Sequence, residues 1–187
     1  MERYSPRYLV ISIVLIILGL SFLWYGLKPP NPAPLVEIAP IATTSATYGI
    51  AGERVYVSKV VDGDTIVTGD NRTVRFIGID TPETVDPRRP VGCFGKEASN
   101  EVKKLLSGKE VILQKDISDK DMYDRILRYI YLPLADGTIL FVNDYLAREG
   151  FAKVMTYPPD VKFDVQFREA EKLAKEEKRG LWGKCHN

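Results

Sequence analysis

Histidine is almost absent from this chain of 187 residues, since the only one is His186 in the C-terminal tail. No nucleophile or metal motif surrounds it, so the sequence excludes catalysis by histidine. Cysteine is scarce as well, and two residues, Cys93 and Cys185, are too few ligands for a metal site.

An excess of charge of one sign is also lacking. Three of the 26 basic residues and one of the 25 acidic residues precede residue 29, which leaves 23 against 24 in the rest of the chain. An avid, non-specific binder of duplex nucleic acid carries a basic surplus, so this class is disfavoured. The balance favours contact with short or single-stranded segments at one local basic site.

What the chain does have is one long apolar run without a charged residue, from Leu9 to Leu27. As a helix this run spans ~28 Å, close to the ~30 Å hydrocarbon core of a bilayer. Arg3 and Arg7 precede the run and only Lys28 follows it closely, so the positive-inside rule places the N-terminus in the cytoplasm. Residues 1–28 are therefore predicted to be a transmembrane signal anchor that leaves the rest of the chain extracytoplasmic.

A cleavable signal peptide is the alternative interpretation of the same run. Such peptides have an apolar region of about 7–15 residues, followed directly by small residues at the cut. Here Lys28 and several prolines follow, and the first small-residue site lies near Ala46. No cysteine for lipid attachment follows either. We favour an uncleaved anchor, with secretion after cleavage as the alternative.

Two further parts follow from length and composition. Residues 29–51 have five prolines before Ile41 and are predicted to form an extended linker, at up to ~3.1 Å per residue. Residues 52–187 have the usual length of one domain and can bury a core.

The first part of this domain predicts a three-stranded meander. Apolar residues alternate or cluster in three runs, separated by the turn sequences Asp62-Gly63 and Gly69-Asp70-Asn71. The runs are Val55–Val61, Thr65–Val67 and Val74–Ile79. In such a meander Asp64 lies just past the first turn and Asp80 at the end of the third strand, so strand pairing brings their carboxylates together.

Four charged residues of this segment indicate chemistry: Asp64, Arg75, Asp80 and Glu83. Carboxylates for a hard metal ion beside an arginine are what hydrolysis of a phosphodiester requires. Each motif alone is more often structural, because Asp-Gly is commonly a tight turn and Pro82 can open a short helix. Period-2 alternation puts Arg75 on the opposite face of the strand from Asp80. Either the strand bends here, or the arginine and the metal approach their target from different directions.

Three amphipathic helices follow, and we assign their apolar faces to the core rather than to chemistry. They are predicted over Gly95–Leu106 with a stop at Gly108, over Val142–Glu149 with a stop at Gly150, and over Asp164–Arg179 with a stop at Gly180. The third helix presents Phe167, Ala170, Leu173 and Ala174 on one face.

Together these segments resemble the thermonuclease, or staphylococcal-nuclease-like, family over roughly Arg54 to Trp182. The motifs that carry the resemblance are Val60–Glu83, Gly95-Lys96-Glu97-Ala98, Tyr123-Asp124-Arg125, Asn143 followed by Leu146, Gly150–Val154 and Gly180-Leu181-Trp182. Several separated motifs in the same order argue against chance similarity. The resemblance implies an α+β, mainly β fold, namely a five-stranded OB-fold β-barrel with three α-helices, here preceded by one N-terminal transmembrane helix.

The resemblance also implies a calcium site. Asp64 and Asp80 would ligate Ca²⁺ through their carboxylates and Thr81 through its backbone carbonyl. Such oxygen ligands suit this ion, although other hard cations accept them too. Only the family comparison selects calcium among them.

The same resemblance assigns residues to the substrate. Arg75 and Arg125 would contact the phosphate, while Glu83 would act as general base or orient the attacking water. Tyr123 would donate a hydrogen bond near the scissile phosphate, and Tyr157 would stack on a base. For each tyrosine, ordinary packing is the competing interpretation.

The resemblance also covers two more basic residues, and the chain differs from the family pattern at two positions near Arg125. Arg88 and Arg89 match a basic loop of the family and would touch a nucleic-acid backbone, with a merely solvated loop as the alternative. The family commonly has lysine where this chain has Met122 and glycine where it has Asp124. Aspartate tolerates the left-handed backbone that glycine would supply. Its carboxylate beside Arg125 would either orient the guanidinium or repel the substrate.

The two cysteines fit an extracytoplasmic domain. In an oxidising compartment an even count suggests one disulfide, Cys93–Cys185, with two free thiols as the alternative. Because the closed loop is long, the chain-entropy relation gives ~4–5 kcal/mol of stabilisation.

Three functions from different classes remain open. The first, implied by the resemblance, is a membrane-tethered, outward-facing, calcium-dependent nuclease that hydrolyses DNA and RNA and leaves 3′-phosphates. The second is a non-catalytic OB module that binds nucleic acid. The third is an exported interaction domain that binds calcium only for stability. We predict nucleic acid as the partner, a membrane contact through residues 9–27, and no protein partner.

Overall fold

The computed structural model describes residues 49–84, 88 and 90–185. The apolar run Leu9–Leu27, the linker up to residue 48, Arg89 and His186 lie outside the described residues. Within the described ranges no helix combines the length and the apolar character that crossing a membrane requires.

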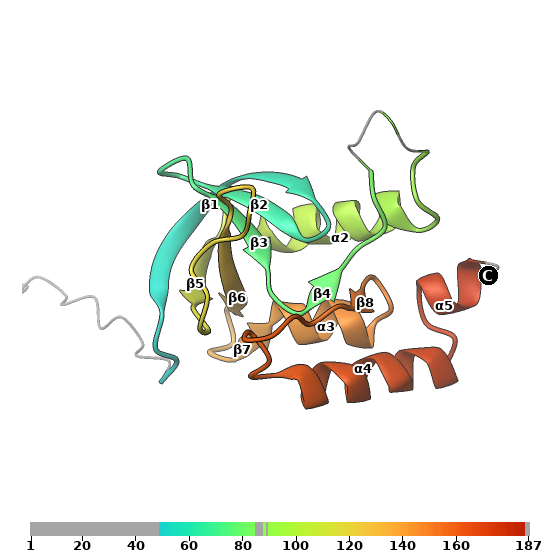
Figure 1. Ribbon diagram of the computed structural model, residues 1–187. Coiled ribbons are helices and arrows are strands. Elements are labelled where there is room, and N and C mark those ends of the chain that lie inside the picture. The colour runs from blue at the N-terminus through green and yellow to red at the C-terminus, as the bar shows by residue number, and fades with distance from the viewer. Residues whose placement is uncertain (1–48, 85–87, 89, 186–187) are drawn as a thin grey trace, which may run out of the picture. The chain divides into compact units, whose positions relative to one another are not determined.

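Five strands close into a barrel, which Figure 1 shows in cyan, green and yellow. They are β1 (Glu53–Asp62), β2 (Thr65–Thr68), β3 (Thr73–Phe76), β5 (Glu110–Gln114) and β6 (Ile126–Pro133). Neighbouring strands run antiparallel except β3 and β6, which pair in parallel and close the barrel. Closure removes the open sheet edges, and it confirms the predicted five-stranded barrel.

Strand β1 pairs with two different strands because it bends. Its first half pairs with β5 from Glu53 to Tyr56, and its second half pairs with β2 through two register shifts. Such irregularities increase the local twist, which lets one strand turn the corner of a small barrel. The meander predicted from the turn sequences therefore forms as β1, β2 and β3.

The third run of the meander does not continue as one strand. The sequence predicted Val74–Ile79, whereas β3 ends at Phe76 and a separate β4 (Ile79–Asp80) pairs with β8 (Lys153–Val154). Between them Gly78 has a φ of +81°, and a Cβ there would lie 2.5 Å from the Phe167 ring. Only glycine fits this turn, so the strand breaks there and the chain changes direction.

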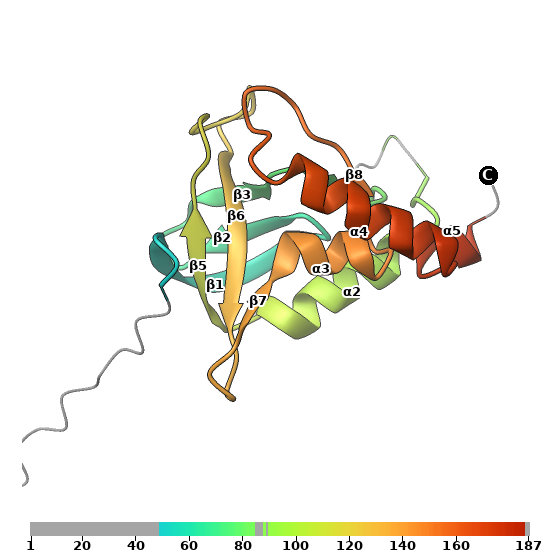
Figure 2. The same ribbon diagram turned by 90° about the horizontal axis from the view of Figure 1, so that it is seen from below.

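Helices cover one side of the barrel, as Figure 2 shows. They are α2 (Gly95–Leu106), α3 (Val142–Arg148), α4 (Asp164–Glu176) and a short α5 (Leu181–Lys184), and β7 (Ile139–Phe141) leads from β6 into α3. Helix α2 has the predicted bounds, and Gly108 follows it with a φ of +67°. Helices α3 and α4 pack side by side in Figure 2.

The predicted third helix needs two corrections. It ends at Glu176 rather than at Arg179, because Lys178 adopts a φ of +53°, and Gly180 instead precedes α5. Leu173 is 36% exposed, whereas Phe167, Ala170 and Ala174 are buried. The buried stripe follows the i, i+3, i+7 positions, and Leu173 lies at its border.

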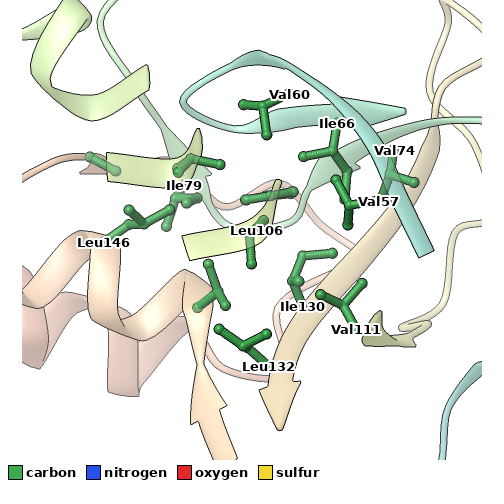
Figure 3. Packing of buried hydrophobic residues seen from close by; sticks show 14 of the residues in the cluster. Val57, Val60, Ile66, Val74, Ile79, Leu106, Val111, Ile130, Leu132 and Leu146 are labelled. Carbon is green, nitrogen blue, oxygen red and sulfur yellow. The ribbon is translucent and has the colours of Figure 1, made fainter. Parts of the chain in front are cut away.

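The core fills the barrel and the space under the helices. Figure 3 shows Val57, Ile66 and Val74 of the barrel facing Leu106 of α2 and Leu146 of α3. The polar side chain of Asn143 is fully buried beside this core. It accepts a hydrogen bond from the Ile130 N–H and donates one to the Ile77 carbonyl, at 2.9 Å each. Helix α3 is thereby fastened to the chain just before the Gly78 turn.

Candidate active site

The structure brings Asp64, Arg75 and Asp80 into direct contact. Asp64 follows the β1–β2 turn, Arg75 lies in β3 and Asp80 ends β4. The Arg75 Nη1 atom forms an ion pair with Asp64 Oδ1, and Nη2 lies 2.6 Å from Asp80 Oδ1. Of the two alternatives left by the sequence, the bend is correct: the Gly78 turn returns Asp80 to Arg75.

The Asp64 carboxylate is held in place by further donors. Its Oδ2 atom accepts hydrogen bonds from the Thr81 N–H at 2.8 Å and the Thr81 hydroxyl at 2.9 Å, while Oδ1 accepts one from the Thr65 hydroxyl at 3.0 Å. A Cβ on Gly63 would lie 2.7 Å from the Thr81 hydroxyl oxygen, so the glycine of the turn permits this close approach. The carboxylate is therefore fixed before any ligand arrives.

Burial dominates the electrostatics of Arg75, whose side chain is only 15% exposed. Burial lowers the pKa of its guanidinium, and Asp80 acts in the opposite direction. Arg125 lies close enough to lower that pKa as well, and Asp62 is close enough to raise it. Because an arginine titrates far above neutral pH, Arg75 keeps its positive charge.

The donor set around Arg75 fits a hard cation. Asp64 and Asp80 both contact the same guanidinium, and with Asp62 nearby three carboxylates lie close to the two guanidinium groups of Arg75 and Arg125. The described residues contain no cluster of three His, Cys, Asp or Glu side chains that could hold a metal. The protein would supply two carboxylates and a backbone carbonyl, and water or substrate would complete the shell.

A cavity of about 450 Å³ opens beside this cluster. Its wall includes Arg75, Arg125, Tyr123 and Tyr157, together with apolar residues such as Met155. Asp64 and Asp80 do not line the cavity, but both contact Arg75, which lines it. The two tyrosines are 71% and 68% exposed, so they are rim residues rather than core.

Asp121 is a site residue that the sequence reasoning missed. Its Oδ2 atom accepts hydrogen bonds from Arg125 at 2.7 Å from Nε and 2.6 Å from Nη2. Its Oδ1 atom accepts the backbone N–H groups of Tyr123 and Arg125, at 2.9 and 3.0 Å. The signal was an aspartate at the first position of a turn, where its carboxylate can accept the N–H two residues on, as in an Asx-turn.

Asp124 does not orient the Arg125 guanidinium. It has the predicted left-handed backbone, with a φ of +64°. Its carboxylate points instead to Lys120, 2.7 Å away, and its side chain is 84% exposed. Asp121 has the orienting position that was considered for Asp124.

Glu83 and Arg88, which follow β4 in the chain, do not line the cavity. Glu83 Oε1 accepts the N–H of Thr84 at 3.0 Å, and the Glu83 carbonyl accepts the N–H of Gly92 at 2.8 Å. A Cβ on Gly95 would lie 2.7 Å from the Pro82 carbonyl oxygen, so the start of α2 packs directly on this segment. Arg88 is exposed in the loop between.

A disulfide joins Cys93, just before α2, to Cys185, just after α5. The two Cα atoms are 5.9 Å apart, within the usual range, and the residues are 92 positions apart in the chain. The rings of Phe94 and Phe151 stack nearby with centroids 5.6 Å apart. The bridge thus ties the C-terminal end of the chain to the segment that packs on Pro82 and Glu83.

Comparison with known proteins agrees with this architecture. The family model for the staphylococcal nuclease homologue matches residues 73–184. A thermonuclease of Staphylococcus hyicus is 34% identical over 186 residues, which cover 97% of this chain and 99% of that protein. A thermonuclease of Staphylococcus intermedius is 42% identical over 136 residues, covering 71% and 78%. Endonuclease YncB of Bacillus subtilis is 38% identical over 135 residues, covering 70% and 62%. On these matches and on its barrel, the chain belongs to the staphylococcal nuclease homologue family.

Proposed function

We propose that this protein is a calcium-dependent nuclease that hydrolyses phosphodiester bonds of DNA and RNA, anchored by residues 9–27 with its domain outside the cytoplasm. One observation carries the catalytic part: the Asp64–Arg75–Asp80 cluster adjoins a cavity that a second arginine also lines. Relatives named thermonuclease and endonuclease support the same activity.

The two arginines are the proposed phosphate ligands. Arg75 and Arg125 approach the cavity from β3 and from the start of β6, so a phosphate between them receives donors from two directions. Forked guanidinium donors match phosphate oxygens and stabilise the extra negative charge that develops as water attacks phosphorus. Arg75 can exchange its contact with Asp80 for the phosphate, because both are oxygen acceptors of similar geometry.

The remaining roles are those that the family resemblance implies. Asp64, Asp80 and the Thr81 carbonyl are the proposed calcium ligands, and the bound ion would supply Lewis acidity at the phosphate. Glu83 is the proposed general base or water-orienting group. Tyr123 donates a hydrogen bond to the phosphate and Tyr157 stacks on a base. Arg88 and Arg89 contact the nucleic-acid backbone.

Digestion of single-stranded DNA by the full chain in detergent tests this function. We expect cleavage with added calcium, and a rate at least about tenfold lower with chelator, because the ion supplies part of the charge stabilisation. Gel separation of end-labelled strands measures both rates. Binding without cleavage in calcium would favour the non-catalytic OB module. Neither binding nor cleavage would favour the calcium-stabilised interaction domain.

Replacing Asp121 with asparagine tests how Arg125 is positioned. The amide keeps the size of the side chain but loses the charge that pairs with the guanidinium, so Arg125 is no longer held toward the cavity. We expect kcat on single-stranded DNA to fall about tenfold, since a misplacement of about 1 Å can cost up to about a hundredfold. Steady-state kinetics in calcium measure this.

Asp124→Asn is the matched control for this variant. It makes the same chemical change three residues away, where the carboxylate contacts Lys120 on the surface and asparagine keeps the left-handed backbone. Its kcat should stay within about twofold of the parent. Equal losses in the two variants would contradict a positioning role for Asp121.

A further inference from the structure

A second hollow, the α2 pocket, lies between α2 and the end of β1, which pack against each other in Figure 1. Its volume is about 270 Å³. It is lined by Val61, Thr84, Lys96, Ser99, Asn100 and Lys103. None of these residues lines the cavity of Arg75 and Arg125, so the two hollows are distinct.

Two lysines make the α2 pocket positive. Lys96 and Lys103 are seven residues apart, which is about two helical turns, so both lie on the same face of α2. Within the described ranges neither forms an ion pair, whereas Lys104 on the same helix pairs with Glu101 at 3.5 Å. Two ammonium groups without a carboxylate partner beside a concave surface favour an anion.

A buried hydroxyl lies between the two lysines. Ser99 is only 4% exposed, and it lines the pocket wall. A hydroxyl in the pocket wall can donate a hydrogen bond to a polar ligand there.

Thr84 connects the α2 pocket to the candidate active site. Its hydroxyl donates to Asp62 Oδ1 at 2.6 Å, and its N–H donates to Glu83 Oε1 at 3.0 Å. The pocket thus lies directly beyond the segment that carries Glu83. A chain of phosphates that enters at the arginines and passes Glu83 would reach Lys96 and Lys103 next.

We propose that the α2 pocket is a phosphate subsite that holds a second phosphodiester of an extended single strand, away from the bond that is cleaved. The proposal rests on the proposed nuclease function. Lys96 and Lys103 neutralise that phosphate, and the Ser99 hydroxyl donates a hydrogen bond to it. The subsite extends the footprint on the strand and takes no part in the chemistry.

Binding of labelled oligothymidylate to the full chain in detergent, with chelator present, tests this subsite. Fluorescence anisotropy at several salt concentrations compares a twelve-nucleotide strand with a dinucleotide. We expect Lys96→Gln/Lys103→Gln to bind the longer strand about tenfold more weakly at low salt. The slope of log affinity against log salt should fall by about 0.7, since the subsite neutralises one phosphate and each single-strand phosphate contact contributes about 0.7. Affinity for the dinucleotide should not change.

Two further variants separate a built subsite from general electrostatics. Lys104→Gln/Lys172→Gln removes the same charge from lysines that are paired on the surface, and it should leave the slope nearly unchanged. Ser99→Ala keeps the charge and should still weaken binding of the longer strand severalfold. Thermal melting checks that each variant is folded.

The outcomes distinguish the subsite from the nuclease itself. Two results would overturn the subsite while cleavage by the parent protein stands. One is an equal salt-dependence slope in the two double variants, and the other is an equal loss of affinity for the dinucleotide and for the longer strand. If the parent protein neither binds nor cleaves the strand, the proposed function fails and the subsite fails with it.

Discussion

Replacing Arg75 with lysine is expected to lower kcat on single-stranded DNA by about a hundredfold to a thousandfold. This is the range seen when one preorganised donor to a developing negative charge is removed. Lysine keeps the positive charge between Asp64 and Asp80 but presents a point charge rather than a planar fork. It cannot keep its contact with Asp64 and also offer forked donors to a phosphate. Single-turnover kinetics in calcium measure the chemical step directly.

Lysine is chosen over alanine because of the burial of the site. Removing the whole guanidinium would leave the Asp64 carboxylate buried without its partner, which costs about 3–5 kcal/mol and would confuse lost activity with lost folding. Arg72→Lys is the matched control, because Arg72 pairs with Glu53 and Asp70 on the surface. A folded Arg75→Lys protein with nearly parental kcat would refute the role proposed for this residue.

Removal of the disulfide is expected to have the largest effect on stability. The double variant Cys93→Ser/Cys185→Ser should lose about 4–5 kcal/mol of unfolding free energy, because the bridge closes a 92-residue separation and restricts the unfolded chain. Urea denaturation followed by tryptophan fluorescence measures the change, since Trp182 lies in α5 next to the bridge. The loss should appear as a lower midpoint with a similar or steeper slope.

Reduction of the parent protein is the companion experiment. A thiol reductant should shift the midpoint of the parent toward that of the double serine variant and should leave the variant itself unchanged. If both proteins unfold at the same denaturant concentration without reductant, the bridge contributes nothing to stability. A mass that shows two free thiols in the purified protein would mean that it does not form there.

Features set by neighbours in the chain could be predicted from the sequence. The turns Asp62-Gly63 and Gly69–Asn71 define the meander, and the bounds of Gly95–Leu106 follow from its apolar spacing and from Gly108. The left-handed backbone of Asp124 also follows from local chemistry, because a short polar side chain tolerates it. Each of these depends on contacts within a few residues, where propensity and sterics dominate.

Features that depend on contacts between distant segments could not be predicted from local sequence patterns. The Gly78 break depends on Phe167, which approaches from α4, and the left-handed Lys178 after α4 places its carbonyl oxygen against Gly183 of α5. The hold of Asp121 on Arg125 went unrecognised because a turn aspartate gives the same signal with or without a functional partner. Leu173 fits the apolar pattern, yet it lies at the border of the buried stripe.

The sequence by itself indicated the family, the meander of β1 to β3 and the main helices, because these follow from local patterns and from motifs in a fixed order. Only the tertiary structure decided that Asp64 and Asp80 meet on one guanidinium and that Lys96, Ser99 and Lys103 face a hollow beyond Thr84. The physical reason is that side-chain convergence depends on strand register, on turns that only glycine permits and on packing between elements. These are long-range conditions that no short window of sequence contains.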